Sequence, residues 1–329
     1  VSEVKSTDLV IDWPFPAGES WSIIQANAAA ASDSHGGPFA YCWDMVRAGV
    51  SSSSGLPFAA GATAKIVFVE ESLPSGSGNA GNVVIQRFGE GRYGSYLHIK
   101  PGSYTKRFAT GGGINFLPQA LPWASRPTPH TGTLLGEVGD TGTGVGNYHM
   151  HFCVTTTPDR KAFGPFESVP VAFRNYSYST NQGNSWTYVS VGVPKNGNWV
   201  KRGAPKPGQS GPTENAAAKT ISFGTVKGEV TLTRGDGKPT GAGTVTIGVT
   251  SAWGEPLKTA TVAVSATGAP WPFELKNVPA FNGIKVSAGY AGPWSKPFSI
   301  VAAESSPFNL APDGTVTRKL SLKTTAPIQ

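Results

Sequence analysis

Short runs of alternating apolar and polar residues, each closed by glycine, proline, asparagine or serine, restrict this chain to a β-rich fold. Glycine and proline account for 42 and 27 of its 329 residues, whereas only 14% of residues are charged. That balance favours short strands and many turns over long charged helices. The only plausible short helix lies near residues 25–31. In the N-terminal part the strand-like runs lie at 64–70, 82–88, 94–99, 133–138, 148–154 and 169–176.

A polar segment rich in proline and glycine, residues 205–219, lacks any apolar period and predicts a linker. It would separate a first domain, residues 1–204, from a second, residues 220–329. Alternating runs continue through the second domain, and several short strands bounded by turns are typical of a β-sandwich. All five histidines and both cysteines precede the linker. We therefore expect an all-β protein in which the chemistry belongs to the first domain.

The net charge of +7 is basic and falls mostly in the C-terminal part of the chain. A basic surface favours any polyanion, whether nucleic acid, an anionic membrane surface or an acidic cell wall, and does not choose among them. Residues 220–329 could hold the chain on anionic wall polymers, and a rigid spacer is an equal alternative. The charge forms no stripe interleaved with aromatic residues, which argues against a nucleic-acid partner. No apolar run is long enough to be a transmembrane segment, and no signal peptide is evident, so any export signal would already have been removed.

Two histidines, His149 and His151, are separated by one residue in a strand-like run, which places both imidazoles on one face. Such a pair can simply be solvated on a wet face. A second segment adds His35 in a glycine- and proline-rich turn, followed by Asp44 in another strand-like run. Two imidazoles and one carboxylate, with a fourth position left for water, make the open tetrahedral set of a catalytic zinc ion.

The cysteines test the same arrangement, because Cys42 precedes Asp44 by two residues and Cys153 follows His151 by two. If the two runs are antiparallel neighbours with Asp44 opposite His151, Cys42 falls opposite Cys153 at the spacing of a cross-strand pair. A disulfide between Cys42 and Cys153 would then indicate an oxidising compartment. Two buried free thiols, or thiolates that join the zinc ion, are the alternatives.

Three sequence motifs occur in an order that resembles the lysostaphin/LytM-like zinc endopeptidases, which cut peptidoglycan peptides. PFPAGESW (14–21) and HGGPFAYCWDM (35–45) resemble the family's opening strand and ligand block. GSYLHIKPGS (94–103) resembles its tyrosine-x-histidine segment, and GEVGDTGTGVGNYHMHFCV (136–154) its glycine-rich approach to the histidine-x-histidine strand. The resemblance covers roughly residues 12–175 and implies an antiparallel β-sheet zinc peptidase domain.

The resemblance implies one Zn²⁺ ion per chain, with His35, Asp44 and His151 as ligands and His98 and His149 as the catalytic pair beside the activated water. Zinc lowers the pKa of bound water towards about 7 and polarises a carbonyl group, and a histidine can then transfer the proton to the leaving amine. Three aromatic side chains near these positions could contact substrate, although packing is the commoner role of such residues: Tyr41, Tyr96 and Tyr148.

The expected function is that of a secreted zinc endopeptidase that hydrolyses amide bonds in peptidoglycan stem peptides or cross-bridges. A secreted protease of glycine-rich proteins is the alternative enzyme, because a groove that accepts flexible linkages would also accept such chains. A catalytically inactive wall-binding or scaffold protein is the alternative outside enzymes, and the retained ligand set His35, Asp44 and His151 argues against it.

Overall fold

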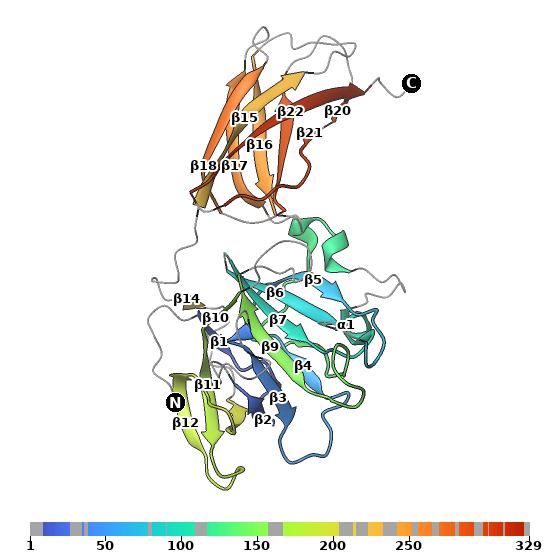
Figure 1. Cartoon of the computed structure of the whole chain (residues 1–329), viewed down its shortest axis with the longest axis vertical. Helices are drawn as coiled ribbons and strands as arrows, with labels where there is room; N and C mark the ends of the chain where they lie inside the picture. The colour runs from blue at the N-terminus through green and yellow to red at the C-terminus, as the bar shows by residue number, and fades with distance from the viewer. Residues whose placement is uncertain are drawn as a thin grey trace. The chain divides into compact units, whose positions relative to one another are not determined.

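The computed structural model describes two compact units, 1–220 and 221–329, each with its own hydrophobic core (Figure 1). Nearly all regular structure is β-strand, which confirms the predicted all-β class. Among the described residues, no helix is long and apolar enough to cross a bilayer. The described residues are 9–26, 35, 39–77, 81–89, 91–108, 117–156, 167–203, 213–214, 223–232, 242–251, 256–264, 270–279, 283–292, 299–301, 303–311 and 313–325.

The first unit is built on a 12-stranded sheet with the path β14-β1-β11-β13-β2-β3-β9-β7-β6-β5, to which β10 adds at β9 and β12 at β11. A small separate sheet pairs β4 (Pro57–Ala59) with β8 (Leu134–Glu137). Among the described residues of this unit, all strand pairings are antiparallel except that of β1 with β11. The strands of the large sheet are β1 (Leu9–Asp12), β2 (Ser20–Gln25), β3 (Trp43–Arg47), β5 (Lys65–Glu70), β6 (Val83–Gly89), β7 (Arg92–Leu97), β9 (Met150–Thr155), β10 (Ser168–Val169), β11 (Val171–Ser179), β12 (Thr187–Gly192), β13 (Trp199–Arg202) and β14 (Thr213–Glu214).

The core of this unit lies against one face of the central strands, where alternate residues of β3 and β9 are apolar and fully buried. Trp43 pairs with Phe152 across the two strands, and both rings pack near Phe173 of β11. Since successive residues of a strand point to opposite faces, the residues between these core positions face away from the core. That second face carries the histidines.

Two details of the first unit differ from expectation. A helix was expected near residues 25–31, but Gln25 is the last residue of strand β2. Residues 27–34, which hold most of the expected helix, lie outside the described part of the chain. The described helices are α1 (Ser103–Phe108) and the 3-10 turns Pro118–Ala120 and Trp123–Ser125. Within the predicted linker, Thr213 and Glu214 form β14 and pair with β1, because hydrogen bonding to an edge strand needs no apolar period.

The second unit is the predicted β-sandwich. One four-stranded sheet has the order β18-β15-β22-β20 and the other β17-β16-β19-β21, and one apolar cluster fills the space between them. The strands are β15 (Phe223–Leu232), β16 (Gly243–Thr250), β17 (Pro256–Val264), β18 (Trp271–Pro279), β19 (Lys285–Ala291), β20 (Ser299–Val301), β21 (Ala303–Glu304) and β22 (Thr315–Thr325).

A close backbone approach in the sandwich gives a test of this fold. Gly228 of β15 lies opposite Arg318 of the parallel strand β22, and a Cβ atom at Gly228 would collide with the Arg318 carbonyl oxygen. We expect Gly228→Ala to lower the free energy of unfolding of the second unit by about 1–3 kcal/mol, because a backbone atom must move. Urea unfolding followed by circular dichroism measures this change.

Gly289 of β19 is the matched control, because a Cβ atom there meets nothing within 4 Å. We expect Gly289→Ala to change the free energy of unfolding by less than about 0.5 kcal/mol. Equal effects of the two substitutions would contradict the parallel pairing of β15 with β22.

Candidate metal centre

Three neighbouring strands bring the predicted site residues together: β3, β9 and β7, which lie side by side in the first unit (Figure 1). Asp44 of β3 pairs directly with His151 of the antiparallel strand β9, which is the register considered in the sequence analysis. On the other side of β9, His151 pairs with Leu97, the residue before His98. Since β-strand side chains alternate, His149, His151 and Cys153 share the face opposite the core residues Met150 and Phe152.

Three donors converge at this face. Asp44 Oδ1 lies 2.8 Å from His151 Nδ1, and Asp44 Oδ2 lies 3.2 Å from His35 Nε2. One ligand atom from each of the three residues falls within 4.8 Å of the other two. All three side chains are buried, so water cannot freely solvate their charges. The structure therefore brings the three predicted ligands into a single cluster.

The polar atoms of this cluster lack the hydrogen bonds that burial normally demands. Within the described part of the chain, the two ring nitrogens of His35 have no hydrogen-bond partner of acceptable geometry. The same is true of Asp44 Oδ1, although this oxygen lies close to His151 Nδ1. Buried polar atoms are almost always satisfied, and exceptions require an explanation. Nitrogen and carboxylate donors this close together, with short contacts but poor hydrogen-bond geometry between them, fit a zinc ion that accepts one lone pair from each.

The electrostatics keep the carboxylate ionised. Burial alone raises the pKa of Asp44, but its contacts with His151 and His35 outweigh this effect and hold the pKa far below its ordinary range. Burial lowers the pKa of His151, whereas Asp44 and Cys153 raise it, and the balance puts it at about 9. Asp44 is thus ionised at neutral pH, and a cation that binds there would take the place of the proton that His151 carries.

His98 stands beside this cluster because the backbone leaves the regular strand at this point. In a continuing strand His98 would point away from the face that holds His151, but its φ of 61° is left-handed and breaks the alternation. Its ring centroid lies 5.6 Å from that of His151 and 4.7 Å from that of His149. A non-glycine residue in this conformation is strained, and such strain is concentrated at functional sites.

Both His98 and His149 are fixed through Nδ1 by a backbone carbonyl group. His98 Nδ1 lies 2.7 Å from the Thr141 oxygen, and His149 Nδ1 lies 3.1 Å from the Asn147 oxygen. A carbonyl oxygen can only accept, so each Nδ1 carries the proton and each Nε2 keeps its lone pair. His149 Nε2 lies 3.6 Å from Asp44 Oδ1, which directs it towards the cluster.

Burial also keeps these two imidazoles neutral. Desolvation and the neighbouring His151 and His149 lower the pKa of His98 to about 3. Desolvation lowers the pKa of His149 as well, although Asp44 partly opposes it. At neutral pH both rings are therefore proton acceptors, as a general base must be.

Two residues that sequence reasoning missed hold this arrangement in place. Asp140 organises the glycine-rich segment before β9, because its Oδ2 accepts hydrogen bonds from Ser75 Oγ at 2.8 Å and the Gly146 amide at 2.9 Å. Gly81 has a φ of 69°, and a Cβ atom there would collide with the Thr141 carbonyl group that fixes His98. A glycine far from any motif carries no sequence signal for such a contact.

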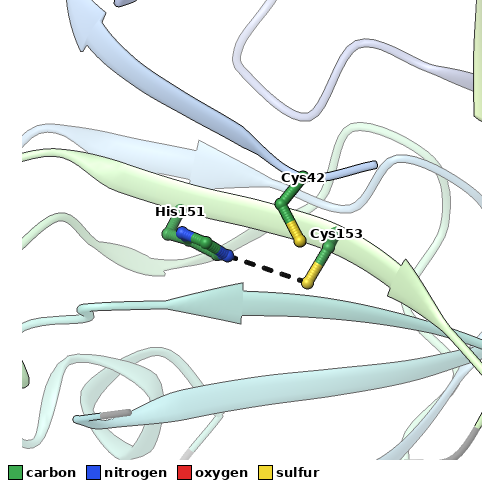
Figure 2. Close-up of side chains that lie close together, drawn as sticks. All are labelled: Cys42, His151 and Cys153. Atoms are coloured by element: carbon green, nitrogen blue, oxygen red, sulfur yellow. Dashed lines mark hydrogen bonds between the residues drawn. The ribbon is translucent and has the colours of Figure 1, made fainter. Parts of the chain in front are cut away.

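The predicted disulfide is not formed. Cys42 and Cys153 are buried thiols, although they lie opposite one another as the register of β3 and β9 requires. Figure 2 shows their sulfur atoms next to the ring edge of His151, and Cys153 Sγ lies 3.9 Å from His151 Nε2. Each sulfur atom lies within 4.8 Å of the other and of a ring nitrogen of His151, so the two thiols are close together without an S–S bond.

The tyrosines expected to contact substrate divide into two groups. Tyr96 is a core residue, which corrects the expectation: it pairs with Phe152 on the face away from the histidines, and its hydroxyl donates to Gln86 and accepts from the Gly61 amide. Tyr41 and Tyr148 are only half-buried, and Tyr148 packs against the edge of the core. Both remain candidates for contact with a ligand.

Comparisons with known proteins identify no relative. No family model matches this chain, and neither does any curated protein. Among solved structures, a cysteine-to-alanine mutant of the pilus-presented adhesin Spy0125 (Cpa) covers 97% of this chain and 99% of its own, at 8% identity and a TM-score of 0.22. A crystal form of the same adhesin reaches 7% identity and a TM-score of 0.20, covering 96% and 98%. Values this low carry no argument on fold or function.

Zinc affinity should distinguish the three proposed ligands from the two flanking histidines, His98 and His149. We expect the purified chain to bind one zinc ion tightly, and Asp44→Ala to reduce zinc affinity at least 100-fold, because the only carboxylate of the ligand group is removed. His98→Ala should retain zinc within about tenfold, since His98 contacts a neighbouring imidazole and a backbone oxygen instead. Competition against a chromophoric chelator measures both values, and loss of zinc from His98→Ala would contradict the assignment of ligands.

Proposed function

We propose that this protein is a secreted zinc-dependent endopeptidase that hydrolyses amide bonds in peptidoglycan stem peptides or cross-bridges. The observation that carries the proposal is the grouping of a His35–Asp44–His151 donor set with two neighbouring imidazoles, His98 and His149, whose Nδ1 atoms donate to backbone carbonyl groups. A ligand set alone would suit a structural ion. Two neutral bases beside it suit hydrolysis.

Zinc held by these donors would supply Lewis-acid activation of water and of the scissile carbonyl group. Nε2 of His149, the closer of the two bases to Asp44, is placed to accept the proton of the attacking water. The ring of His98 lies 4.7 Å from that of His149, centroid to centroid, and its Nε2, once protonated, can donate to the oxyanion or to the leaving amine. Their fixed Nδ1 contacts orient both rings before substrate arrives, which limits reorganisation during the reaction.

The substrate class rests on the motif resemblance and on the accessible part of the site. His35 is 1% exposed, whereas Asp44, His98, His149 and His151 are each 6–9% exposed, so these four side chains keep a small solvent-exposed surface. Tyr41 and Tyr148 flank the two ligand strands and are half-buried. The exposed part of each tyrosine ring could contact a peptide, and the choice of wall peptides as substrate rests on the motif resemblance.

The direct test is incubation of the protein with purified peptidoglycan, with and without a zinc chelator, and mass spectrometry of the soluble fragments. We expect new peptide termini that disappear with the chelator and return with added zinc. An Asp44→Ala variant should release no fragments. A wild-type protein that binds zinc yet releases nothing from several wall types would contradict the proposal. If that protein instead cleaved a glycine-rich protein in a parallel incubation, the proposed substrate would change from peptidoglycan to such proteins.

Turnover should depend on the glycine that supports His98. We expect Gly81→Ala to lower kcat about 10–100-fold while zinc remains bound, because the displaced Thr141 carbonyl no longer orients the ring of His98. Fragment release under saturating substrate measures kcat.

The matched control is Gly18→Ala. Gly18 has a similar left-handed φ of 83°, but a Cβ atom there meets nothing within 4 Å. Both substitutions therefore impose the same local strain, and only one of them disturbs Thr141. Equal losses of turnover would show that strain, and not the position of His98, is responsible.

A further inference from the structure

A second group of ligand atoms lies behind His151, on the side away from Asp44. Sγ of Cys42, Sγ of Cys153 and a ring nitrogen of His151 all lie within 4.8 Å of one another. Both cysteines are fully buried, and Cys153 Sγ lies 3.9 Å from His151 Nε2 (Figure 2). His151 thus presents Nδ1 to the carboxylate cluster and Nε2 to two thiols.

We propose that Cys42, Cys153 and His151 form a second metal site, selective for thiophilic divalent cations such as Cd²⁺, that competes with the zinc centre for His151. Metal–sulfur and metal–nitrogen bonds of roughly 2.3 and 2.0 Å place two sulfur donors and one nitrogen donor about 3.5–4 Å apart. The observed group is compatible with that spacing. Two sulfur ligands and one imidazole are softer than the two imidazoles and one carboxylate of the zinc centre, which sets the selectivity.

Competition follows from the proton of the imidazole ring. A neutral imidazole has one lone pair, so His151 can bind a metal through Nδ1 only if Nε2 carries the proton, and the reverse. With zinc at the carboxylate cluster, the Nε2 proton points to the thiols. With an ion at the thiols, the proton resides on Nδ1, 2.8 Å from Asp44 Oδ1, and blocks that nitrogen as a ligand.

The binding step is balanced without an oxidant or a reductant. Each thiol loses its S–H proton to solvent, two metal–sulfur bonds form, and His151 Nε2 donates its lone pair to the same ion. The bond from zinc to His151 Nδ1 breaks, and Nδ1 takes up the proton that Nε2 gives up. One divalent cation therefore releases two protons to solvent and removes one of the three zinc ligands.

The thiol site stands on its own geometry, whereas the competition rests on the proposed zinc centre. The first experiment adds Cd²⁺ to the reduced, metal-free protein and records the ultraviolet sulfur-to-cadmium charge-transfer band. We expect the band to saturate at one equivalent and to be absent in Cys42→Ala/Cys153→Ala. Cys42→Ala alone should bind Cd²⁺ at least tenfold more weakly, and circular dichroism checks that each variant is folded.

The second experiment adds Cd²⁺ to the zinc-loaded protein and follows released zinc with a fluorescent indicator. We expect one zinc ion to be released for each Cd²⁺ bound to the wild type, and none from the double variant at the same Cd²⁺ concentration. A band with no release of zinc overturns the competition. Equal release of zinc from the wild type and the double variant also overturns the competition, because Cd²⁺ would then be entering the zinc centre directly.

Three further outcomes separate this inference from the proposed function. Absence of the band in a protein that binds zinc through Asp44, or a Cys42–Cys153 disulfide in the protein as isolated, overturns the thiol site alone. A protein that gives the band but never binds zinc through Asp44 overturns the proposed function and leaves the thiol site standing.

Discussion

The pairing of Asp44 with His151 across β3 and β9 is the contact on which the rest of the site depends. It places a carboxylate and an imidazole 2.8 Å apart in a buried setting, where their attraction is strong and water cannot replace it. A shift of register by one residue would turn His151 towards the core and bring Phe152 to the site. The aromatic packing of Trp43 against Phe152 and Phe173 opposes that shift, so the core fixes the chemistry on the other face.

The flanking histidines are positioned by the backbone and not by other side chains. Carbonyl groups of Thr141 and Asn147 accept from Nδ1 of His98 and His149, and the glycine-rich segment that supplies them is fixed by Asp140. Backbone carbonyl groups do not titrate, so the contacts that orient the two rings do not depend on the protonation of an acceptor side chain. The left-handed backbone at His98 is the local strain that this geometry requires.

Much of this arrangement was predictable because it follows from the period of a strand. Residues two apart share a face, so His149 with His151 and Cys42 with Asp44 could be grouped from the sequence alone. The same rule should have excluded Tyr96, which lies next to Leu97 on β7 and therefore points to the core opposite His151. The tyrosine was assigned from its closeness in sequence to His98, where the strand alternation breaks.

The remaining features depend on contacts between distant segments, which no local pattern encodes. Gly81 lies directly against the Thr141 carbonyl group, although the two residues belong to different loops. Strand β14 pairs with β1 although its sequence resembles a linker. The state of Cys42 and Cys153 is also not a matter of register, because opposed cysteines can be a disulfide, two thiols or a metal site. Their contact with His151 is what distinguishes them from simple core residues.

The most direct test of the account is the position of zinc in crystals of the zinc-loaded protein, located by anomalous scattering at the zinc edge. The account predicts a peak at about 2.0–2.2 Å from a nitrogen of His35, an oxygen of Asp44 and Nδ1 of His151, with the imidazoles of His98 and His149 nearby but not coordinated. Zinc bound only at the two cysteines, or coordinated without Asp44, would contradict it.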